Sequence, residues 1–202
     1  MAARALLLCM FLAFPDSAGA SPHSGAPPAS FAACRGNDAA FADKAEALIA
    51  AGIDAERAKQ APDAPMLRPD SNLASIARRR SCDMAHGADF SHTDAAGRAI
   101  AVDMVSEIFG NYGAVGENII RMGDAAMAMI GAARSFGPEE FSRAAVESWM
   151  KSPEHRANII DAHFDSSGIG VAIVDGQAFA TQIFRGPMRQ RKSFKGFNEQ
   201  DK

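Results

Sequence analysis

Apolar residues recur at helical spacing through the first two thirds of the chain. This spacing predicts helices over Asp38–Ala51, over a segment that begins after Asp70, and over Val102–Phe109. Pro138, followed by two glutamates, is typical of a further helix start, because proline fits the first turn and carboxylates favour the positive helix end. Ser152 before Pro153 predicts a short last helix with Ser152 as its cap.

Two β-rich runs follow these helices. Ile169–Val174 and Ala178–Phe184 are separated by Asp175-Gly176-Gln177, and the Asp-Gly pair is a strong signal for a hairpin turn. Helices followed by a terminal hairpin predict a mixed α and β domain with antiparallel strands.

The first twenty residues have the pattern of a cleaved signal peptide. Arg4 precedes the ten apolar residues Ala5–Phe14, and Ala18-Gly19-Ala20 resembles a cleavage site. Ten apolar residues are too few to span a bilayer as a helix. We therefore expect a soluble product, secreted or periplasmic. The expected organisation is a signal peptide over 1–20, a flexible mature N-terminus over 21–37, one folded domain over 38–185 and a basic disordered tail over 186–202.

Composition narrows the classes of partner. The 202 residues include 21 Lys and Arg against 24 Asp and Glu, a net charge of −3. A nucleic-acid-binding surface needs a basic excess, so we expect no nucleic-acid partner. We also expect no stable membrane insertion, a monomer, and as ligand a small molecule, with lipid among the candidates.

The number of cysteines left after cleavage predicts one disulfide. Removal of residues 1–20 leaves two of the three cysteines, Cys34 and Cys82, in a compartment where disulfides persist. Two buried free thiols are the alternative.

Three polar residues stand out as candidates for chemistry. His92 and His155 lie in polar segments beside turn or cap residues, and Glu117 comes just before an apolar pair. A carboxylate buried there needs a partner or a metal. Sequence spacing alone does not bring the three together.

Several spaced motifs, in order, give the chain a family resemblance between about Leu67 and Phe184. They are Leu73 with Ala77, Met84-Ala85, Phe90-Ser91-His92 with Asp94 and Gly97, Gly116-Glu117-Asn118-Ile119, Trp149-Met150 with Ser152-Pro153, His155-Arg156 with Asn158-Ile159-Ile160, Gly168-Ile169-Gly170-Val171, and Ala180-Thr181-Gln182 with Phe184. With these motifs the chain resembles the CAP superfamily (SCP/TAPS: cysteine-rich secretory proteins, antigen 5, plant pathogenesis-related class 1 proteins), in its bacterial secreted branch.

The resemblance implies an α+β fold, a three-layer α-β-α sandwich with an antiparallel sheet. It also implies a central cleft in which His92, Glu117 and His155 converge and can hold zinc or another divalent cation. Many eukaryotic members have a second Glu where this chain has Ser152. The ligand set that remains resembles an open catalytic zinc site or a metal-free polar cleft. Asp94 and Asn118 are interpreted as structural supports.

Three classes of function remain open at this point. The first is a secreted CAP-domain protein whose cleft binds a metal or a small ligand, with no established reaction. The second is a metal-dependent hydrolase, with Glu117 as ligand or base. The third is a lipid- or sterol-binding module, in which the Met-rich stretch Ala125–Gly131 lines an apolar groove. Whether the protein is an enzyme is therefore left open.

Overall fold

A four-stranded sheet lies at the centre of the molecule, and five helices surround it in the part of the chain described. The computed structural model describes residue 34 and residues 38–110, 113–123 and 137–187. The helices are α2 (Ala39–Gln60), α3 (Ser71–Ala85), α4 (Ile100–Phe109), α6 (Pro138–Lys151) and α7 (Pro153–Ile160). The strands are β1 (Arg68–Pro69), β2 (Val115–Gly123), β3 (Ser166–Val174) and β4 (Gln177–Arg185).

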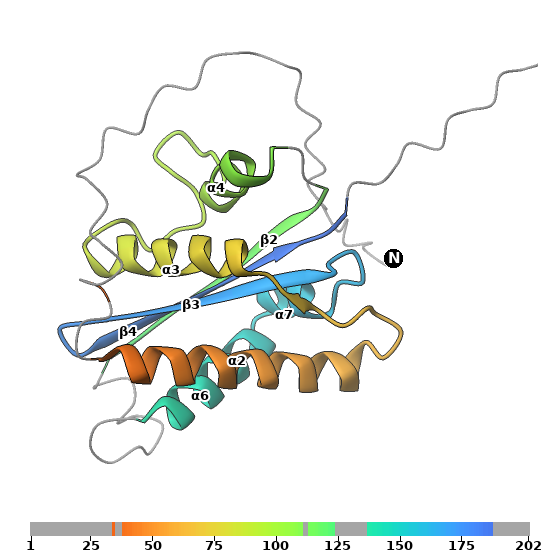
Figure 1. The fold of residues 1–202 in the computed structure, drawn as a ribbon, viewed down its shortest axis with the longest axis horizontal. Helices are drawn as coiled ribbons and strands as arrows, with labels where there is room; N and C mark the ends of the chain where they lie inside the picture. Colours follow the sequence, from red (N-terminus) through yellow and green to blue (C-terminus); the bar gives the residue numbers. More distant parts are fainter. Residues whose placement is uncertain (1–33, 35–37, 111–112, 124–136, 188–202) are drawn as a thin grey trace, which may run out of the picture.

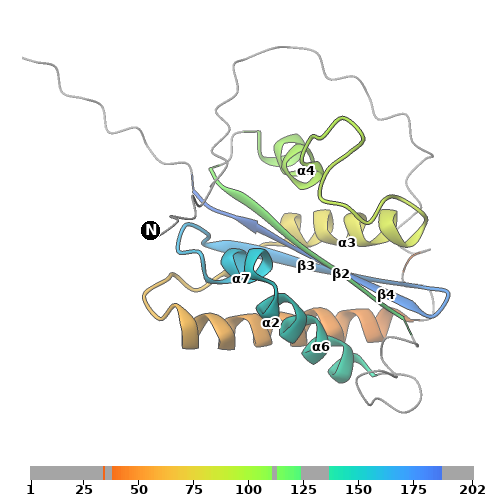
Figure 2. The same cartoon turned by 180° about the vertical axis from the view of Figure 1, so that it is seen from behind.

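The helices cover both faces of the sheet, which gives three layers. Helices α3 and α4 lie on one face, and α2, α6 and α7 lie on the other (Figures 1 and 2). The strand order is β1-β3-β4-β2, with antiparallel pairing except between β3 and the two-residue β1, which are parallel. The predicted α+β sandwich is confirmed, with this one parallel pair added to the antiparallel sheet.

Alternation along β4 sends its side chains into two separate cores. Ala180 and Phe184 pack with Ile49 of α2 and Trp149 of α6. Ile183 points the other way and packs against α3 and α4. Since successive residues of a strand face opposite sides, this one strand holds both layers to the sheet.

Helix α2 is longer than its predicted range, which ended at Ala51. Its buried positions Ala42, Ala45, Ile49 and Ile53 keep a helical period across that point. Gly52 does not end the helix. Its Cα lies close to the side chain of Val146 in α6, and a Cβ added to the glycine would be 3.0 Å from Val146 Cγ2. The glycine therefore allows the two helices to approach.

Two other local features differ from the sequence analysis. No strand was predicted before Ile169, yet Val115–Gly123 form β2, the strand that carries Glu117. Ser152 was expected to cap α7, but its side chain makes no capping hydrogen bond and its Oγ donates to Glu154 Oε2 at 3.2 Å. The predicted helix start after Asp70 is confirmed, and Asp70 caps the helix, because its Oδ1 accepts from Asn72 N and Leu73 N.

The hairpin and the disulfide are confirmed as predicted. Asp175 and Gly176 both have positive φ, which the tight turn between β3 and β4 requires. Cys34 and Cys82 form a disulfide with a Cα–Cα distance of 5.5 Å, so the alternative of two free thiols is wrong. This bond ties the segment before α2 to α3.

Helix α3 packs unusually close to β3, at two glycines. A Cβ on Gly168 would lie 2.0 Å from Ala74 N, and a Cβ on Gly170 would lie 2.0 Å from Arg78 N. Both obstacles are helix backbone, which cannot rotate away. Small residues at these two positions therefore set the distance between the helix layer and the sheet.

We expect Gly170→Ala to lower the free energy of unfolding by about 3 kcal/mol, because the added methyl group must push α3 away from β3. Urea denaturation of the two proteins measures this change. Gly123→Ala is the matched control, since a Cβ there is 3.5 Å from its nearest neighbour. Equal losses for the two variants would show that the α3–β3 approach is not tight.

Several predicted segments lie outside the described residues: the signal peptide 1–20, most of the mature N-terminus, the Met-rich stretch 125–131 and the tail from residue 188. The described end of the chain is attached to the domain, since Gly186 N donates to Ala114 O at 2.9 Å. Within the described ranges, no helix combines the length and the apolar character needed to cross a bilayer.

Candidate functional site

A cavity of about 300 Å³ opens at the β2 edge of the sheet and brings together the three residues singled out by sequence. His92 comes from the loop after α3, Glu117 from β2 and His155 from α7. The loop and α4 border the cavity on one side of β2, and α7 borders it on the other. The cavity therefore straddles an edge strand, which is why segments distant in the sequence can meet there.

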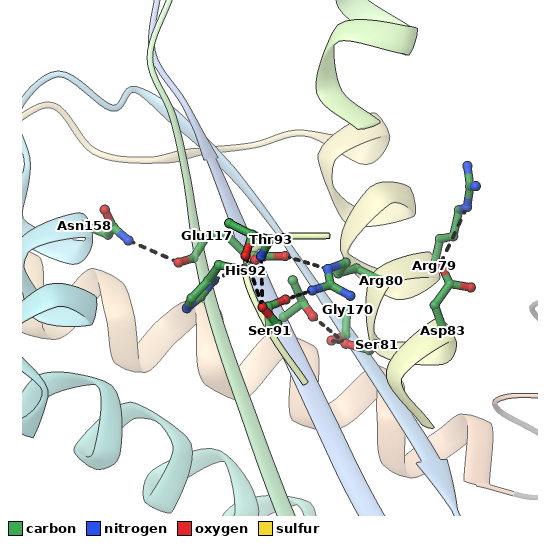
Figure 3. A network of polar contacts seen from close by, with 11 residues as sticks. Arg79, Arg80, Ser81, Asp83, Ser91, His92, Thr93, Glu117, Asn158 and Gly170 are labelled. Atoms are coloured by element: carbon green, nitrogen blue, oxygen red, sulfur yellow. Dashed lines mark hydrogen bonds and ion pairs between the residues drawn. The ribbon is translucent and has the colours of Figure 1, made fainter. Parts of the chain in front are cut away.

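Glu117 lies at the centre of a buried network. Its Oε1 accepts from Arg80 Nε at 3.0 Å, and its Oε2 lies 2.7 Å from His92 Nδ1 (Figure 3). The Glu117 side chain is 5% exposed and that of Arg80 is 2% exposed, whereas His92 is 48% exposed. Both carboxylate oxygens are thus engaged, and the histidine is the member of the network that reaches solvent.

The hydrogen bond to Glu117 selects the tautomer of His92. An ionised carboxylate only accepts, so the proton of this bond belongs to His92 Nδ1. In the neutral imidazole the other nitrogen, Nε2, then has a free lone pair. A carboxylate that is hydrogen-bonded to one ring nitrogen fixes the orientation of a histidine, so that its other nitrogen can bind a metal ion.

Arg80 also anchors the loop that holds His92. The Nη2 atom of Arg80 donates a hydrogen bond to the backbone carbonyl of Ser91, the residue before His92. Asp94 holds the other side of the loop, since its Oδ1 accepts from the backbone N–H groups of Ala96 and Arg98. The structural role predicted for Asp94 fits these contacts.

Two asparagines fix the position of the His155 backbone. Asn118, fully buried beside Glu117 on β2, donates from Nδ2 to the His155 carbonyl at 3.2 Å. Asn158 donates to Asn118 Oδ1 at 2.9 Å and to the Glu117 carbonyl at 3.2 Å. These bonds fasten α7 to β2, so the backbone positions of Glu117 and His155 are coupled.

Two imidazoles face each other across the cavity. The ring centroids of His92 and His155 are 5.8 Å apart. Burial lowers the pKa of His155, and the nearby His92 lowers it further. His155 is therefore kept in the neutral form, which is the form that can bind a metal.

Ser152, at the position of the second family glutamate, is absent from the residues lining the cavity. Glu154, two residues later, does line it. Glu154 is close enough to His155 to oppose the lowering of the histidine pKa. The sequence reasoning did not single out Glu154, because it was interpreted only as part of a helix start.

The sequence analysis also gave no role to Arg80 or to Asn158, although Asn158 belongs to a family motif. Arg80 follows two other arginines on α3, and the arginine run alone does not mark which one is buried. The periodicity of the whole helix does mark it, because Leu73, Ile76, Ala77 and Arg80 share the buried face of α3. An arginine in line with an apolar stripe is a candidate for a buried ion pair.

A different group of described residues has its possible ligand atoms close enough to hold a metal ion. The ligand atoms of Cys34, Cys82 and His86 lie within 4.8 Å of one another, a spacing that the cleft trio does not meet. In this group the two sulfurs are joined as a disulfide, and His86 Nδ1 also lies 3.0 Å from the Cys82 carbonyl. The disulfide leaves no thiolate there to bind a cation.

Comparison with known proteins identifies the family. The family model of the cysteine-rich secretory protein family, CAP, matches residues 51–184. The chain belongs to the CAP family. A search of curated proteins finds no match to it.

Solved structures share the CAP fold at low sequence identity. An outer surface protein of Borrelia burgdorferi is 14% identical with a TM-score of 0.56, covering 71% of this chain and 93% of that one. An extracellular SCP-domain protein of Bacillus anthracis is 22% identical with a TM-score of 0.52, covering 72% of this chain and 41% of that one. At such identities the likeness concerns the fold alone.

Proposed function

We propose that this CAP domain works outside the cytoplasm and binds a divalent cation in the β2-edge cleft, through His92 and His155. The observation that supports the proposal most strongly is the pair of imidazoles lining one cavity, one oriented by a carboxylate and one kept neutral by burial. The disulfide supports an oxidising location.

The two imidazole nitrogens suit zinc, a cation that accepts both nitrogen and oxygen ligands. Imidazole nitrogen is a common zinc ligand, and two such ligands leave positions for water or a small ligand. Glu117 has both oxygens engaged, so in this proposal it orients His92 and compensates the charge of Arg80. Glu154 supplies a carboxylate at the rim. A bound cation would contribute a Lewis acid at this point of the cavity.

Calorimetric titration with zinc tests the proposal. We expect His92→Ala and His155→Ala each to weaken zinc binding at least tenfold, because each removes one of two imidazole ligands. His163→Ala is the matched control, since His163 is exposed and pairs with Asp161 away from the cleft. Equal zinc affinity in wild type and both cleft variants would contradict the proposal.

The pH dependence gives a second readout. The folded-state pKa of His155 lies below its ordinary value, so the folded protein resists protonation that the unfolded chain accepts. Zinc binding should therefore be retained as pH falls to about 6.5, the pKa of free imidazole, and decline below it. Glu154→Gln should weaken zinc binding several-fold, because it removes the charge of a carboxylate that lines the cavity.

A further inference from the structure

The C-terminal end of α3 carries a cluster of metal-ligating side chains that is separate from the β2-edge cleft. Cys82 and His86 are four residues apart, so they lie on the same side of the helix end. Cys34, from the segment before α2, joins them through its disulfide with Cys82. His86 Nδ1 lies 3.5 Å from Cys34 Sγ and 3.9 Å from Cys82 Sγ. The imidazole therefore lies next to both sulfurs at once.

The distances from His86 to the two sulfurs match the edges of a tetrahedral zinc site. With zinc–sulfur and zinc–nitrogen bonds of about 2.3 and 2.0 Å, a sulfur and a nitrogen ligand lie about 3.5 Å apart, and two sulfur ligands about 3.8 Å apart. Only the two sulfurs are too close, because they are bonded to each other. Since the Cα atoms of Cys34 and Cys82 are 5.5 Å apart, side-chain rotation can separate the sulfurs once that bond is broken.

The surroundings of the cluster suit a cation that enters from solvent. The two sulfurs are buried against Ala172 of β3, with Ala85 packed beside them, whereas His86 is exposed. The C-terminal end of a helix carries a partial negative charge, and no lysine or arginine occurs in the last turn of α3, over the described residues 82–85. A metal ion here would be covered by apolar groups on one side and reached from the His86 side.

Metal binding through Nδ1 would replace one hydrogen bond of His86. Its Nδ1 lies 3.0 Å from the Cys82 carbonyl. That carbonyl keeps a partner when the ring binds a metal, because the backbone N–H of His86 also donates to it, at 3.0 Å. The ring proton then moves to Nε2. One hydrogen bond contributes little next to zinc–thiolate coordination, which can drive the folding of a small domain.

We propose that Cys34, Cys82 and His86 bind zinc when the disulfide is reduced. A dithiol reductant gives two electrons and two protons to the disulfide, is itself oxidised to a disulfide, and leaves two thiols. Zinc then displaces the two thiol protons and is held by two thiolates and the imidazole, with one position left for water. The link between the segment before α2 and α3 thus has two forms, a disulfide under oxidising conditions and a zinc bridge under reducing ones.

Titration of the reduced full chain with cobalt(II), followed by zinc, tests the proposal. Cys9→Ser, His92→Ala and His155→Ala are introduced beforehand, so that neither the third cysteine nor the cleft histidines supply ligands. A phosphine reduces the disulfide and takes up an oxygen atom from water, whereas a dithiol would itself bind zinc. We expect a thiolate-to-cobalt charge-transfer band that saturates at one metal per chain and disappears when zinc is added. The oxidised protein should give no such band.

Single substitutions identify the ligands. His86→Ala should weaken zinc binding to the reduced protein at least tenfold, because it removes one of three ligands. His163→Ala is the matched control, since His163 is exposed and pairs with Asp161. Cys34→Ser leaves a single thiolate and should weaken zinc binding at least as much as His86→Ala does.

Urea denaturation gives a readout that remains valid if reduction loosens the fold. Zinc should raise the unfolding midpoint of the reduced protein, because it binds the folded state and restores the link between Cys34 and α3. The same zinc concentration should leave the midpoint of the oxidised protein unchanged, and a chelator should reverse the effect in the reduced one. His86→Ala should lose most of this stabilisation.

A saturable band and a zinc-dependent midpoint in the reduced protein, both diminished in His86→Ala, support the zinc site. Absence of a saturable band in the reduced protein overturns the proposal. Equal zinc affinity in His86→Ala and His163→Ala also overturns it, because the imidazole would then be no ligand. Since the cleft histidines are absent from every protein compared, these outcomes do not depend on zinc binding at the β2 edge.

Discussion

Replacing Arg80 with methionine is expected to lower the free energy of unfolding by about 3–5 kcal/mol, because it leaves the buried Glu117 carboxylate without its guanidinium partner. The remaining partner, His92, is half exposed and sits on a loop that Arg80 also anchors through the Ser91 carbonyl. The variant should therefore lose cleft geometry together with stability. Urea denaturation measures the loss in stability, and zinc titration measures the loss at the cleft.

The neighbouring arginine provides the control for Arg80→Met. Arg79 lies on the same helix, is partly exposed, and has Asp83 and Glu107 at 3.8 Å. Arg79→Met should cost about 1 kcal/mol or less, as exposed ion pairs generally do. The double variant Arg80→Met/Glu117→Gln should recover part of the loss, since no uncompensated buried charge remains. If Arg80→Met were as stable as Arg79→Met, the ion pair would have no such structural role.

Removing the disulfide is expected to lower the free energy of unfolding by about 4 kcal/mol. Cys34 and Cys82 are 48 residues apart, and a crosslink of that span restricts the unfolded chain by this amount in the chain-entropy model. Cys34→Ser/Cys82→Ser, compared with wild type isolated from an oxidising compartment, measures the effect by urea denaturation. Dithiothreitol should lower the wild-type stability to that of the double variant and leave the double variant unchanged. A wild type insensitive to the reductant would contradict the prediction.

Local sequence signals predicted most of the helices and the hairpin, whereas the candidate site residues came from the family motifs. Regular apolar spacing located α3 and α4, and the Asp175-Gly176 pair located the hairpin, because these signals act within a few residues. Strand β2 was missed, since its pairing with β4 depends on a partner some sixty residues away. The family motifs named His92, Glu117 and His155, and the cavity contains all three.

The sequence could not identify the hydrogen-bond partner of each polar side chain. Nothing near Glu117 in the sequence indicates that Arg80, on another element, binds one of its oxygens. Likewise, the serine before Pro153 has the usual signature of a helix cap, but its hydroxyl bonds to the Glu154 carboxylate instead. Both outcomes depend on side-chain placement in three dimensions, and a one-dimensional pattern does not contain it.

The outer edge of β2 has a consequence for self-association. The Trp149 indole donates to the Ile119 carbonyl at 3.1 Å, and Asn158 donates to the Glu117 carbonyl. These two carbonyl groups point away from β4, on the open side of this edge strand. Side chains from α6 and α7 thus occupy both of them. A strand from another molecule, as in amyloid-like stacking, would find these acceptors already used. The residues that build the cleft thereby also protect the sheet against aggregation along this edge.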